Sequence, residues 1–354
     1  MDIEGQNVNI LIVKLSAIGD VIHTLPSLAE LRRLYPDAHI TWVVEEAAAD
    51  LVKHHPCLDE VLISRRKTWI QNVRAGKIRQ SLNEGISFIK GLRKRHYDLV
   101  IDFHGLFKSA IIVFLSRGRR KLGYDSWQEL SGLFLNEKIP EDMDKHAVDR
   151  YLDFLRHLGA KTPEARFVLP SNDEEEKKAQ LLMQKHRLED KKFIAVNPVA
   201  LWDTKLWSNE KFARLADLIQ NRLKLNVVFT GSDKKPLEAI TALMTTAGLH
   251  LGGETTLICL AGIYKKARAV VTTDSGPMHL AAAVGTPVIA VFGPTDPART
   301  GPYGSRHTVI RSGEDCSPCF LKTCPEKKCM DHITPEQVFA AVEKTVMEEK
   351  NGVK

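Results

Sequence analysis

The sequence predicts an α/β protein built from two Rossmann-like, doubly wound domains. Its 354 residues exceed the roughly 100–200 residues of one ordinary domain. In each half, short β-branched runs alternate with stretches of helical period, which favours a parallel sheet with crossover helices. The alternation pauses between about residues 162 and 192. We therefore expect an N-terminal domain over residues 1–165 and a C-terminal domain over residues 185–354.

Both halves supply enough strands and helices for such a sheet. The predicted strands are 8–13, 39–44, 61–64 and 98–102, followed by 193–197, 226–230, 270–273 and 288–292. The predicted helices include 82–95, 106–115, 173–186, 209–223, 236–247, 257–267, 277–284 and 335–349. Since ligands bind beyond the carboxyl ends of such strands, two facing sheets predict a cleft between the domains. The last helix, 335–349, could return to the N-terminal domain.

Composition excludes several classes of protein. The apolar fraction of 44% and the charged fraction of 27% are typical of a globular chain. The longest apolar runs, 267–274 and 287–293, fall well short of the roughly 18–20 residues that span a bilayer. The N-terminus does not resemble a signal peptide. Four of the six cysteines lie within 316–329, unlike the spread of a secreted disulfide protein. We therefore expect a cytoplasmic protein.

Positive charge is concentrated in the N-terminal half. The formal net charge is +6, and basic clusters occur at 65–67, 93–95 and 117–121. Such clusters attract a phosphorylated substrate, an acidic lipid surface or nucleic acid. No nucleic-acid-binding module accompanies them, so we expect no nucleic-acid partner.

The first candidate for chemistry follows the opening strand, at residues 14–20. One glycine stands where a dinucleotide site requires three, and the Gly-Lys-Ser/Thr of a P-loop is absent. What remains is the carboxylate of Asp20 at a strand-to-helix turn. It is either a functional group at the cleft or a helix cap, and the residues alone leave both readings open.

Two further constellations lie in the C-terminal half. Lys205 precedes a helix, where an ammonium adds to the preference of a helix N-terminus for anions such as phosphate. From the residues alone, an exposed loop lysine is the favoured alternative. Ser275 and Gly276 open another helix and could present backbone N–H groups to a diphosphate. Asp274 would repel phosphate, so it either binds a sugar hydroxyl or caps that helix.

Taken together, these segments resemble the ADP-heptose:lipopolysaccharide heptosyltransferase family. The matching segments are 13–21, 197–198 with 205–207, 274–280 and 291–297, in the order of the family. The resemblance implies the two-domain GT-B architecture of glycosyltransferases. It also implies transfer of L-glycero-D-manno-heptose from ADP-heptose, with inversion and without a metal or other cofactor.

Segments 43–46, 102–109 and 145–150 most resemble the first heptosyltransferase, which acts on the Kdo of the lipopolysaccharide inner core. The implied partners are ADP-heptose, Kdo-lipid A and an anionic membrane surface, with the protein peripheral at the cytoplasmic face of the inner membrane. One alternative is a second-heptosyltransferase-like enzyme, or one using another sugar nucleotide, that acts on a later core acceptor. Another is a non-enzymatic protein that binds anionic glycolipid.

The resemblance also assigns roles to residues. Asp20 is the implied general base. The implied donor-binding residues are Thr204, Lys205, Ser232, Thr255, Asp274, Ser275 and Gly276. The implied acceptor-binding residues are the basic loop Arg65, Arg66 and Lys67, together with Lys108, His146 and Arg150.

The cysteine-rich segment is a departure from the first heptosyltransferase. Cys316, Cys319, Cys324 and Cys329 could hold a structural zinc ion, although their spacing is not that of a standard zinc ribbon. Reduced structural cysteines are the alternative. The acidic pair Asp142 and Asp144 is expected to be a solvated loop rather than a catalytic metal site.

Overall fold

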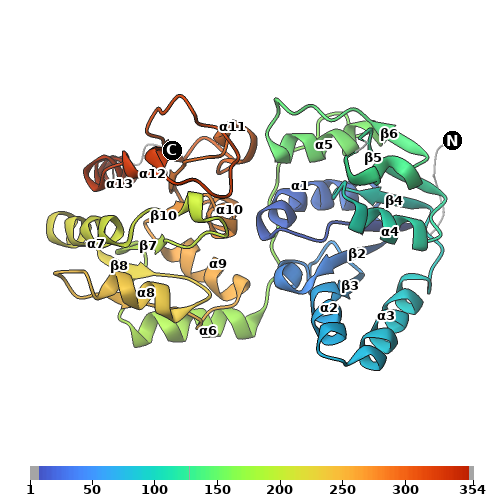
Figure 1. Cartoon of the computed structure of the whole chain (residues 1–354), viewed down its shortest axis with the longest axis horizontal. Coiled ribbons are helices and arrows are strands. Elements are labelled where there is room, and N and C mark those ends of the chain that lie inside the picture. Colours follow the sequence, from blue (N-terminus) through green and yellow to red (C-terminus); the bar gives the residue numbers. More distant parts are fainter. Residues whose placement is uncertain (1–7, 127, 351–354) are drawn as a thin grey trace. The chain divides into compact units, whose positions relative to one another are not determined.

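The computed structural model describes residues 8–126 and 128–350 and divides the chain into two compact units, Met1–Ser171 and Asn172–Lys354. Each unit contains one six-stranded sheet with every neighbouring pair of strands parallel. Helices cover the faces of each sheet (Figure 1). The predicted fold class is confirmed.

The sheet of the first domain is centred on β1. Its strands are β1 (Asn9–Val13), β2 (His39–Glu45), β3 (Glu60–Ser64), β4 (Leu99–Asp102), β5 (Arg120–Tyr124) and β6 (Glu137–Ile139). Their spatial order is β3-β2-β1-β4-β5-β6. Ile12 pairs with Trp42 on one side and with Ile101 on the other, and all three side chains are fully buried. Continuous apolar runs are what a parallel sheet covered on both faces requires.

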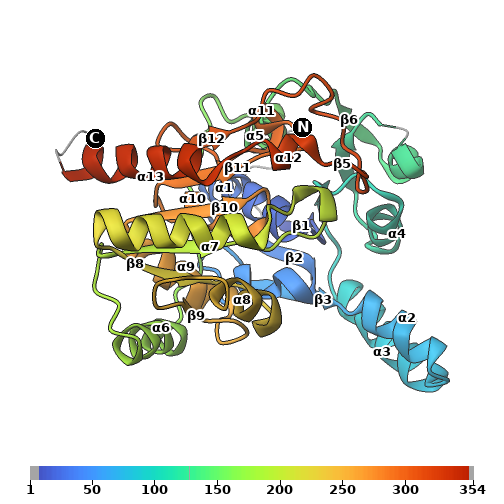
Figure 2. The same ribbon diagram turned by 60° about the vertical axis from the view of Figure 1, so that its left-hand side comes forward.

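The helices of the first domain are α1 (Ile18–Leu34), α2 (Arg66–Arg74), α3 (Ile78–Leu92), α4 (Phe107–Leu115) and α5 (Ala147–His157), with short 3₁₀ segments η1 (Glu46–Leu51) and η2 (Gln128–Phe134). Two features correct the sequence prediction. Arg66 and Lys67 lie in the first turn of α2 rather than in a loop, and α3 begins four residues before the predicted 82. Figure 2 shows α2 and α3 as a hairpin that protrudes from the first-domain sheet.

The second domain repeats the same strand order. Its strands are β7 (Phe193–Asn197), β8 (Asn226–Phe229), β9 (Leu249–His250), β10 (Ala269–Thr273), β11 (Val288–Val291) and β12 (Thr308–Ile310), arranged β12-β11-β10-β7-β8-β9. Counted within each domain, both orders are 3-2-1-4-5-6, the doubly wound order of dinucleotide-binding folds. The order reverses between β1 and β4 in one sheet and between β7 and β10 in the other. Ligands of such folds bind at this switch point.

The helices of the second domain are α6 (Asp173–Lys185), α7 (Asn209–Leu218) with the π-helical turn η4 (Ile219–Leu223), α8 (Lys234–Thr241), α9 (Leu257–Lys266), α10 (Gly276–Ala283), α11 (Pro297–Thr300), α12 (Lys328–Asp331) and α13 (Pro335–Lys350), with the 3₁₀ turn η3 (Asp203–Lys205). The final helix, α13, packs on α7, and Val338 and Val342 are fully buried in the core of this domain. Its return to the N-terminal domain stays a prediction. Within the described ranges, no helix combines the length and apolarity needed to cross a bilayer.

Candidate active site

Polar side chains cluster at the switch point of each sheet. In the first domain, Lys14 follows β1 and Asp102 ends β4, the two strands between which the order reverses. In the second domain, the loop after β7 carries Lys205, and Asp274 directly follows β10. The topology therefore selects both groups as candidate sites independently of any motif.

Lys14 is a buried ammonium at the first switch point. Its side chain is 3% exposed, and Nζ donates to the Phe103 carbonyl at 2.9 Å and to the Tyr151 hydroxyl at 2.6 Å. Burial lowers the pKa of Lys14, while the carboxylates of Asp20 and Asp102 oppose that shift. No role was predicted for this residue from the sequence.

Asp20 is the third residue of α1 and makes one capping hydrogen bond. Its Oδ2 accepts the backbone N–H of Ala17 at 3.0 Å, which is half of a capping box. The side chain is half-buried, and its charge acts on Lys14 and Tyr151. Because one carboxylate oxygen suffices for the cap, a structural role and a chemical role are compatible.

Asp102 and His104 shape the loop after β4. Asp102 accepts the N–H groups of His104 and Gly105 at 2.9 and 3.1 Å and the Ser109 hydroxyl at 2.8 Å. Burial raises the pKa of Asp102, and these hydrogen bonds oppose the shift. Burial, followed by the charges of Lys14, Lys108 and Arg66, lowers the pKa of His104 to about 2. The imidazole of His104 is therefore neutral at physiological pH.

Glu45 forms ion pairs with three of the predicted acceptor-binding residues. It ends β2, and its side chain is only 4% exposed. Its carboxylate lies 3.3 Å from Arg66, 3.4 Å from Lys108 and 3.7 Å from Lys67. Lys108 also donates to the Ser16 hydroxyl at 2.8 Å, and burial lowers its pKa. An open cavity of about 360 Å³ is lined by Glu45, Glu46, Ala47, Ser64 and Lys67.

The other predicted acceptor-binding residues have different surroundings. Arg65 pairs with Glu46 at 3.3 Å, beside the Glu45 cluster. His146 caps α5, where Nδ1 accepts the Val148 N–H at 3.2 Å. Arg150 is buried and pairs with Glu141 at 2.5 Å. These contacts divide the six predicted residues into Arg65, Arg66, Lys67 and Lys108 around Glu45 and Glu46, and His146 and Arg150 at the start of α5.

In the second domain, Lys205 and Asp274 form one ion pair. Their Nζ and Oδ2 atoms are 2.5 Å apart, and the side chains are 16% and 6% exposed. The Thr295 hydroxyl donates to the same oxygen at 2.6 Å. The Lys205 ammonium also lies 4.5 Å from the ring centre of Trp202. The lysine is therefore fixed from two sides by a carboxylate and an indole ring.

The N-terminus of α10 lies next in the chain to Asp274. Ser275 is the N-cap residue but makes no side-chain capping bond, because its hydroxyl donates back to the Thr273 carbonyl at 3.3 Å. Gly276 and Pro277 form the first turn. A helix N-terminus without a side-chain cap offers backbone N–H groups and the positive end of a helix dipole to an anion.

The remaining predicted donor-binding residues differ in burial and lie in three separate loops. Thr204 is buried, and its hydroxyl donates to the Leu321 carbonyl at 2.7 Å. Ser232 is exposed in the turn after β8, and Thr255 precedes α9. A backbone hydrogen bond of 3.0 Å from Gly253 to Gly231 joins the loops that carry these two residues. Their contact with a donor stays a prediction.

Comparison with known proteins identifies the family. Residues 86–330 match the model of glycosyltransferase family 9 (heptosyltransferase). The chain belongs to this family. It is 34% identical to lipopolysaccharide heptosyltransferase 1 of Pseudomonas aeruginosa, covering 89% of this chain and 87% of that protein. It is 30% identical to the protein of the same name from Escherichia coli K12, covering 86% and 93%. The chain is thus a glycosyltransferase, and the predicted family resemblance is confirmed.

Solved structures support the same assignment for this glycosyltransferase. Escherichia coli heptosyltransferase WaaC with ADP matches with a TM-score of 0.76 at 27% identity, covering 96% of this chain and all of that one (100%). A family 9 glycosyltransferase from Veillonella parvula matches with a TM-score of 0.83 at 26% identity, covering 98% and 99%.

For the cysteine-rich segment, the sequence left a structural zinc site and reduced structural cysteines as alternatives, and both stay predictions. Within residues 8–126 and 128–350, no three His, Cys, Asp or Glu side chains are grouped so that they could hold a metal ion. Cys316 is exposed, Cys319 and Cys324 are half-buried, and Cys329 is buried at α12. Burial, followed by the neighbouring thiols, raises the pKa of Cys329.

The C-terminal end of the cysteine-rich segment packs against the second domain. Gly293 follows β11, and a Cβ added there would lie 2.6 Å from the Met330 sulfur and 3.1 Å from the Cys329 sulfur. A side chain at position 293 would therefore require the Met330 and Cys329 side chains to move. Cys329 and Met330 also belong to the core cluster of the second domain. The cysteine at the end of the segment therefore takes part in the packing of this core.

Several residues of the candidate site were not assigned a role from the sequence, among them Lys14, Glu45 and Thr295. Lys14 and Glu45 are charged residues at the ends of apolar strand runs, which is a usable signal in a parallel sheet. Thr295 carried no comparable signal, because its contact with Asp274 spans 21 residues of sequence.

Proposed function

We propose that this glycosyltransferase transfers L-glycero-D-manno-heptose from ADP-heptose to the Kdo of the lipopolysaccharide inner core, with inversion and without a metal ion. The observation that carries the proposal is the Lys205–Asp274 pair beside the uncapped N-terminus of α10. This arrangement suits a diphosphate leaving group. The names of the relatives, and the ADP in a matching solved structure, point to the same donor.

In the proposed reaction, the donor occupies the switch point of the second domain. Lys205 and the backbone N–H groups of the first turn of α10 bind the diphosphate. As the bond between the anomeric carbon and the phosphate oxygen breaks, these groups stabilise the negative charge on ADP. Asp274 orients the Lys205 ammonium and is close enough to the α10 N-terminus to bind a sugar hydroxyl.

The proposed role of the first-domain switch point is to activate the acceptor. An acceptor hydroxyl transfers its proton to Asp20 while its oxygen attacks the anomeric carbon from the face opposite the departing ADP, which inverts the configuration. The cap through Oδ2 holds the Asp20 carboxylate in a fixed position. The ammonium of Lys14 adds a fixed positive charge near this carboxylate.

Acceptor recognition is assigned to Arg65, Arg66, Lys67 and Lys108. Their cationic groups surround Glu45 and Glu46 and outnumber these carboxylates, so an excess of positive charge remains for the anionic Kdo and lipid A phosphates. His146 and Arg150 are proposed as additional acceptor contacts. Such an acceptor is lipid-linked, so we place the enzyme at the cytoplasmic face of the inner membrane.

Among the heptosyltransferases, the first is favoured by similarity. Identity to the heptosyltransferase 1 proteins of Pseudomonas aeruginosa and Escherichia coli K12 is 34% and 30%, against 26% for heptosyltransferase 3 of the latter. Action on a later core acceptor would require the acceptor side of the site to accommodate a sugar that already carries heptose.

The deciding experiment is an assay of the purified full chain with ADP-heptose. Kdo-lipid A and an acceptor already carrying one heptose are supplied in parallel, and mass spectrometry detects heptose added to each. We expect addition to Kdo-lipid A, unchanged after treatment with EDTA. Addition only to the heptosylated acceptor would contradict the inner-core assignment, and an absolute requirement for a divalent cation would contradict the metal-independent mechanism.

A further inference from the structure

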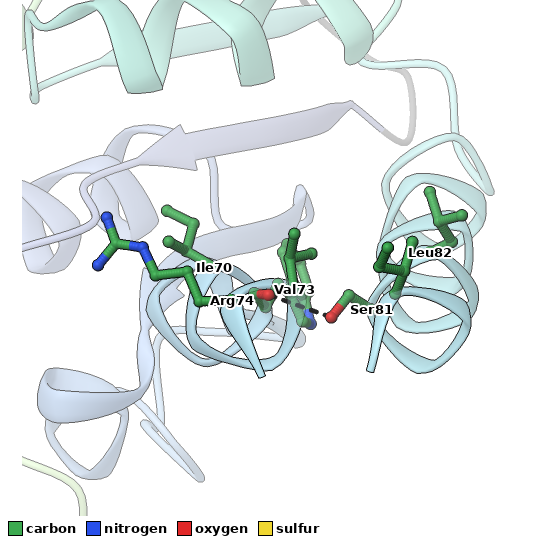
Figure 3. A pocket seen from close by; sticks show the side chains of 7 residues that line it. Ile70, Val73, Arg74, Ser81 and Leu82 are labelled. Atoms are coloured by element: carbon green, nitrogen blue, oxygen red, sulfur yellow. Dashed lines mark hydrogen bonds between the residues drawn. The ribbon is translucent and has the colours of Figure 1, made fainter. Parts of the chain in front are cut away.

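The hairpin of α2 and α3 exposes an apolar face that the proposed reaction does not use. Ile70 and Val73 of α2 are 41% and 47% exposed, and Ile78, Leu82 and Ile86 of α3 are 53%, 59% and 50% exposed. Figure 3 shows Ile70, Val73 and Leu82 pointing to the same side of the hairpin. An open cavity of about 400 Å³ lies among these side chains. Clustered exposed apolar groups of this kind mark an interaction surface.

Contacts of Trp69 join the two helices of the hairpin. The Trp69 ring packs edge-on against Phe88 at 5.7 Å, and its indole N–H donates to Glu84 at 2.9 Å. The Ser81 hydroxyl donates to the Trp69 carbonyl at 3.1 Å, the bond drawn in Figure 3. About half of the surface of the side chains of Ile70, Val73, Ile78, Leu82 and Ile86 remains exposed beside these contacts.

The hairpin is also strongly cationic. Residues 65–95 contain ten Lys and Arg residues and a single acidic residue, Glu84. Arg74, Lys77, Arg79 and Lys90 are exposed, and none of them forms an ion pair with another residue in the described part of the chain. Their charge is therefore available to an anionic surface.

We propose that the α2–α3 hairpin docks this glycosyltransferase onto an anionic phospholipid bilayer. Exposed aliphatic side chains next to unpaired Lys and Arg are the combination that binds a helix at a bilayer interface. The aliphatic side chains enter the headgroup region, and the cations bind lipid phosphates. The inference extends the proposed function, because a lipid-linked acceptor lies in such a surface. Lipid binding itself requires neither donor nor acceptor.

Vesicle flotation of the full chain tests the proposal without any substrate. We expect wild-type protein to float with vesicles of phosphatidylethanolamine and phosphatidylglycerol, and much less with phosphatidylcholine alone. The double variant Ile78→Ser/Leu82→Ser should lower the partition coefficient at least tenfold. A matched control, Leu181→Ser/Leu243→Ser, replaces residues that are 65% and 49% exposed in the second domain and should bind as wild type.

Charge is tested separately with Arg74→Gln/Lys77→Gln/Arg79→Gln, for which we expect at least tenfold weaker binding to the anionic vesicles and a reduced dependence on salt. The control Lys177→Gln/Lys178→Gln alters exposed lysines of α6. All of these positions are exposed, and unchanged thermal melts confirm folding.

Three results would overturn the proposal: no flotation of the wild type, wild-type flotation of both hairpin variants, or a wild-type dimer that the apolar variant abolishes, since the face would then bind a second copy. Heptose transfer to a deacylated, water-soluble acceptor separates this inference from the proposed function. Heptose transfer without flotation would contradict only the proposal that the hairpin binds a membrane. Flotation without transfer to any acceptor would contradict only the proposed reaction.

Discussion

The two switch points have the same strand order but contrasting chemistry. The first-domain switch point carries several interacting charges: Lys14 lies close to Asp20, and Glu45 is paired with a group of basic side chains. The second-domain switch point carries one ion pair, Lys205–Asp274, beside a helix N-terminus. The contrast shows that the topology supplies the location of a site, whereas the side chains at the strand ends determine which ligand it can bind.

The difference matches the tasks that we propose for the two edges. A diphosphate has a fixed geometry, so one ammonium and a row of backbone N–H groups suffice to bind it. An acceptor that presents several anionic groups and a hydroxyl requires a broader set of cations and a base. Three variants test this division of roles, and a fourth, which lies away from both sites, is expected to change stability alone. They follow from the largest expected effect to the smallest.

Asp20→Asn should have the largest effect. An amide can still accept the Ala17 N–H but cannot take a proton, so we expect kcat to fall by about 10²–10⁴-fold with the fold and donor affinity retained. Single-turnover heptose transfer at saturating donor measures this, with a thermal melt of the same sample. Asp173→Asn, in the first turn of α6, is the control. Near-normal transfer by the Asp20 variant would leave Asp20 with a capping role only.

Lys205→Ala should weaken donor binding and slow the reaction. Since the ammonium contacts the diphosphate before and during its departure, we expect kcat/KM for the donor to fall by about 10²–10³-fold, more than kcat does. Lys211→Ala is a close control, because this lysine also lies over an indole ring, 5.9 Å from that of Trp207. Equal losses in the two variants would show that the effect is general destabilisation.

Joint replacement of Arg65, Arg66 and Lys67 by Gln should act on the other substrate. We expect the acceptor KM to rise by roughly tenfold, equivalent to about 1.4 kcal/mol, while the donor KM is retained. Steady-state kinetics with each substrate varied in turn distinguish the two. A parallel rise in the donor KM would mean that the first-domain cations also bind the diphosphate. That result would contradict the proposed division of roles between the two switch points.

Glu137→Gln lies away from both edges and should affect only stability. Hydrogen bonds from Arg120 are the main cause that lowers the pKa of Glu137 from 4.5 to about 2, with His157 adding to the shift. The stabilisation is therefore complete above pH 4.5 and lost as pH falls towards 2. We expect the variant to lose about 1 kcal/mol of unfolding free energy at pH 7.

Urea denaturation of wild type and Glu137→Gln at pH 7, 4.5 and 3 measures that pH dependence. The difference between the two proteins should shrink at the lowest pH, and heptose transfer at pH 7 should be unaffected. A difference that grows on acidification would contradict the assigned direction of the pKa shift.

The sequence predicted the buried strands better than the peripheral ones. The central runs at β1, β4, β7 and β10 are continuous and apolar because both of their faces are covered. Three of the four edge strands were missed: β6 and β12 have three residues each and β9 has two, too few to show a period. β5 begins with Arg120 and Lys121, so it did not resemble a buried strand. Helix α2 was not predicted, because it begins with basic residues and buries no side chain that would give an apolar helical period.

The candidate site was predictable residue by residue but not as a set of contacts. Resemblance to the family placed Lys205 and Asp274 in one donor group, yet their ion pair depends on β7 and β10 being neighbours. Glu45 received no role, because its partners come from α2 and α4, which are distant in sequence. Only the order β3-β2-β1-β4 brings those partners to one edge.

The α2–α3 hairpin also determines where the chain is open to proteolysis. Arg74, Lys77 and Arg79 flank its exposed turn, and α2 buries no side chain, so local opening there costs little. Trypsin should therefore make its first cuts at this turn. A bound bilayer would cover the same peptide bonds, so the rate of nicking would report lipid occupancy in unlabelled protein.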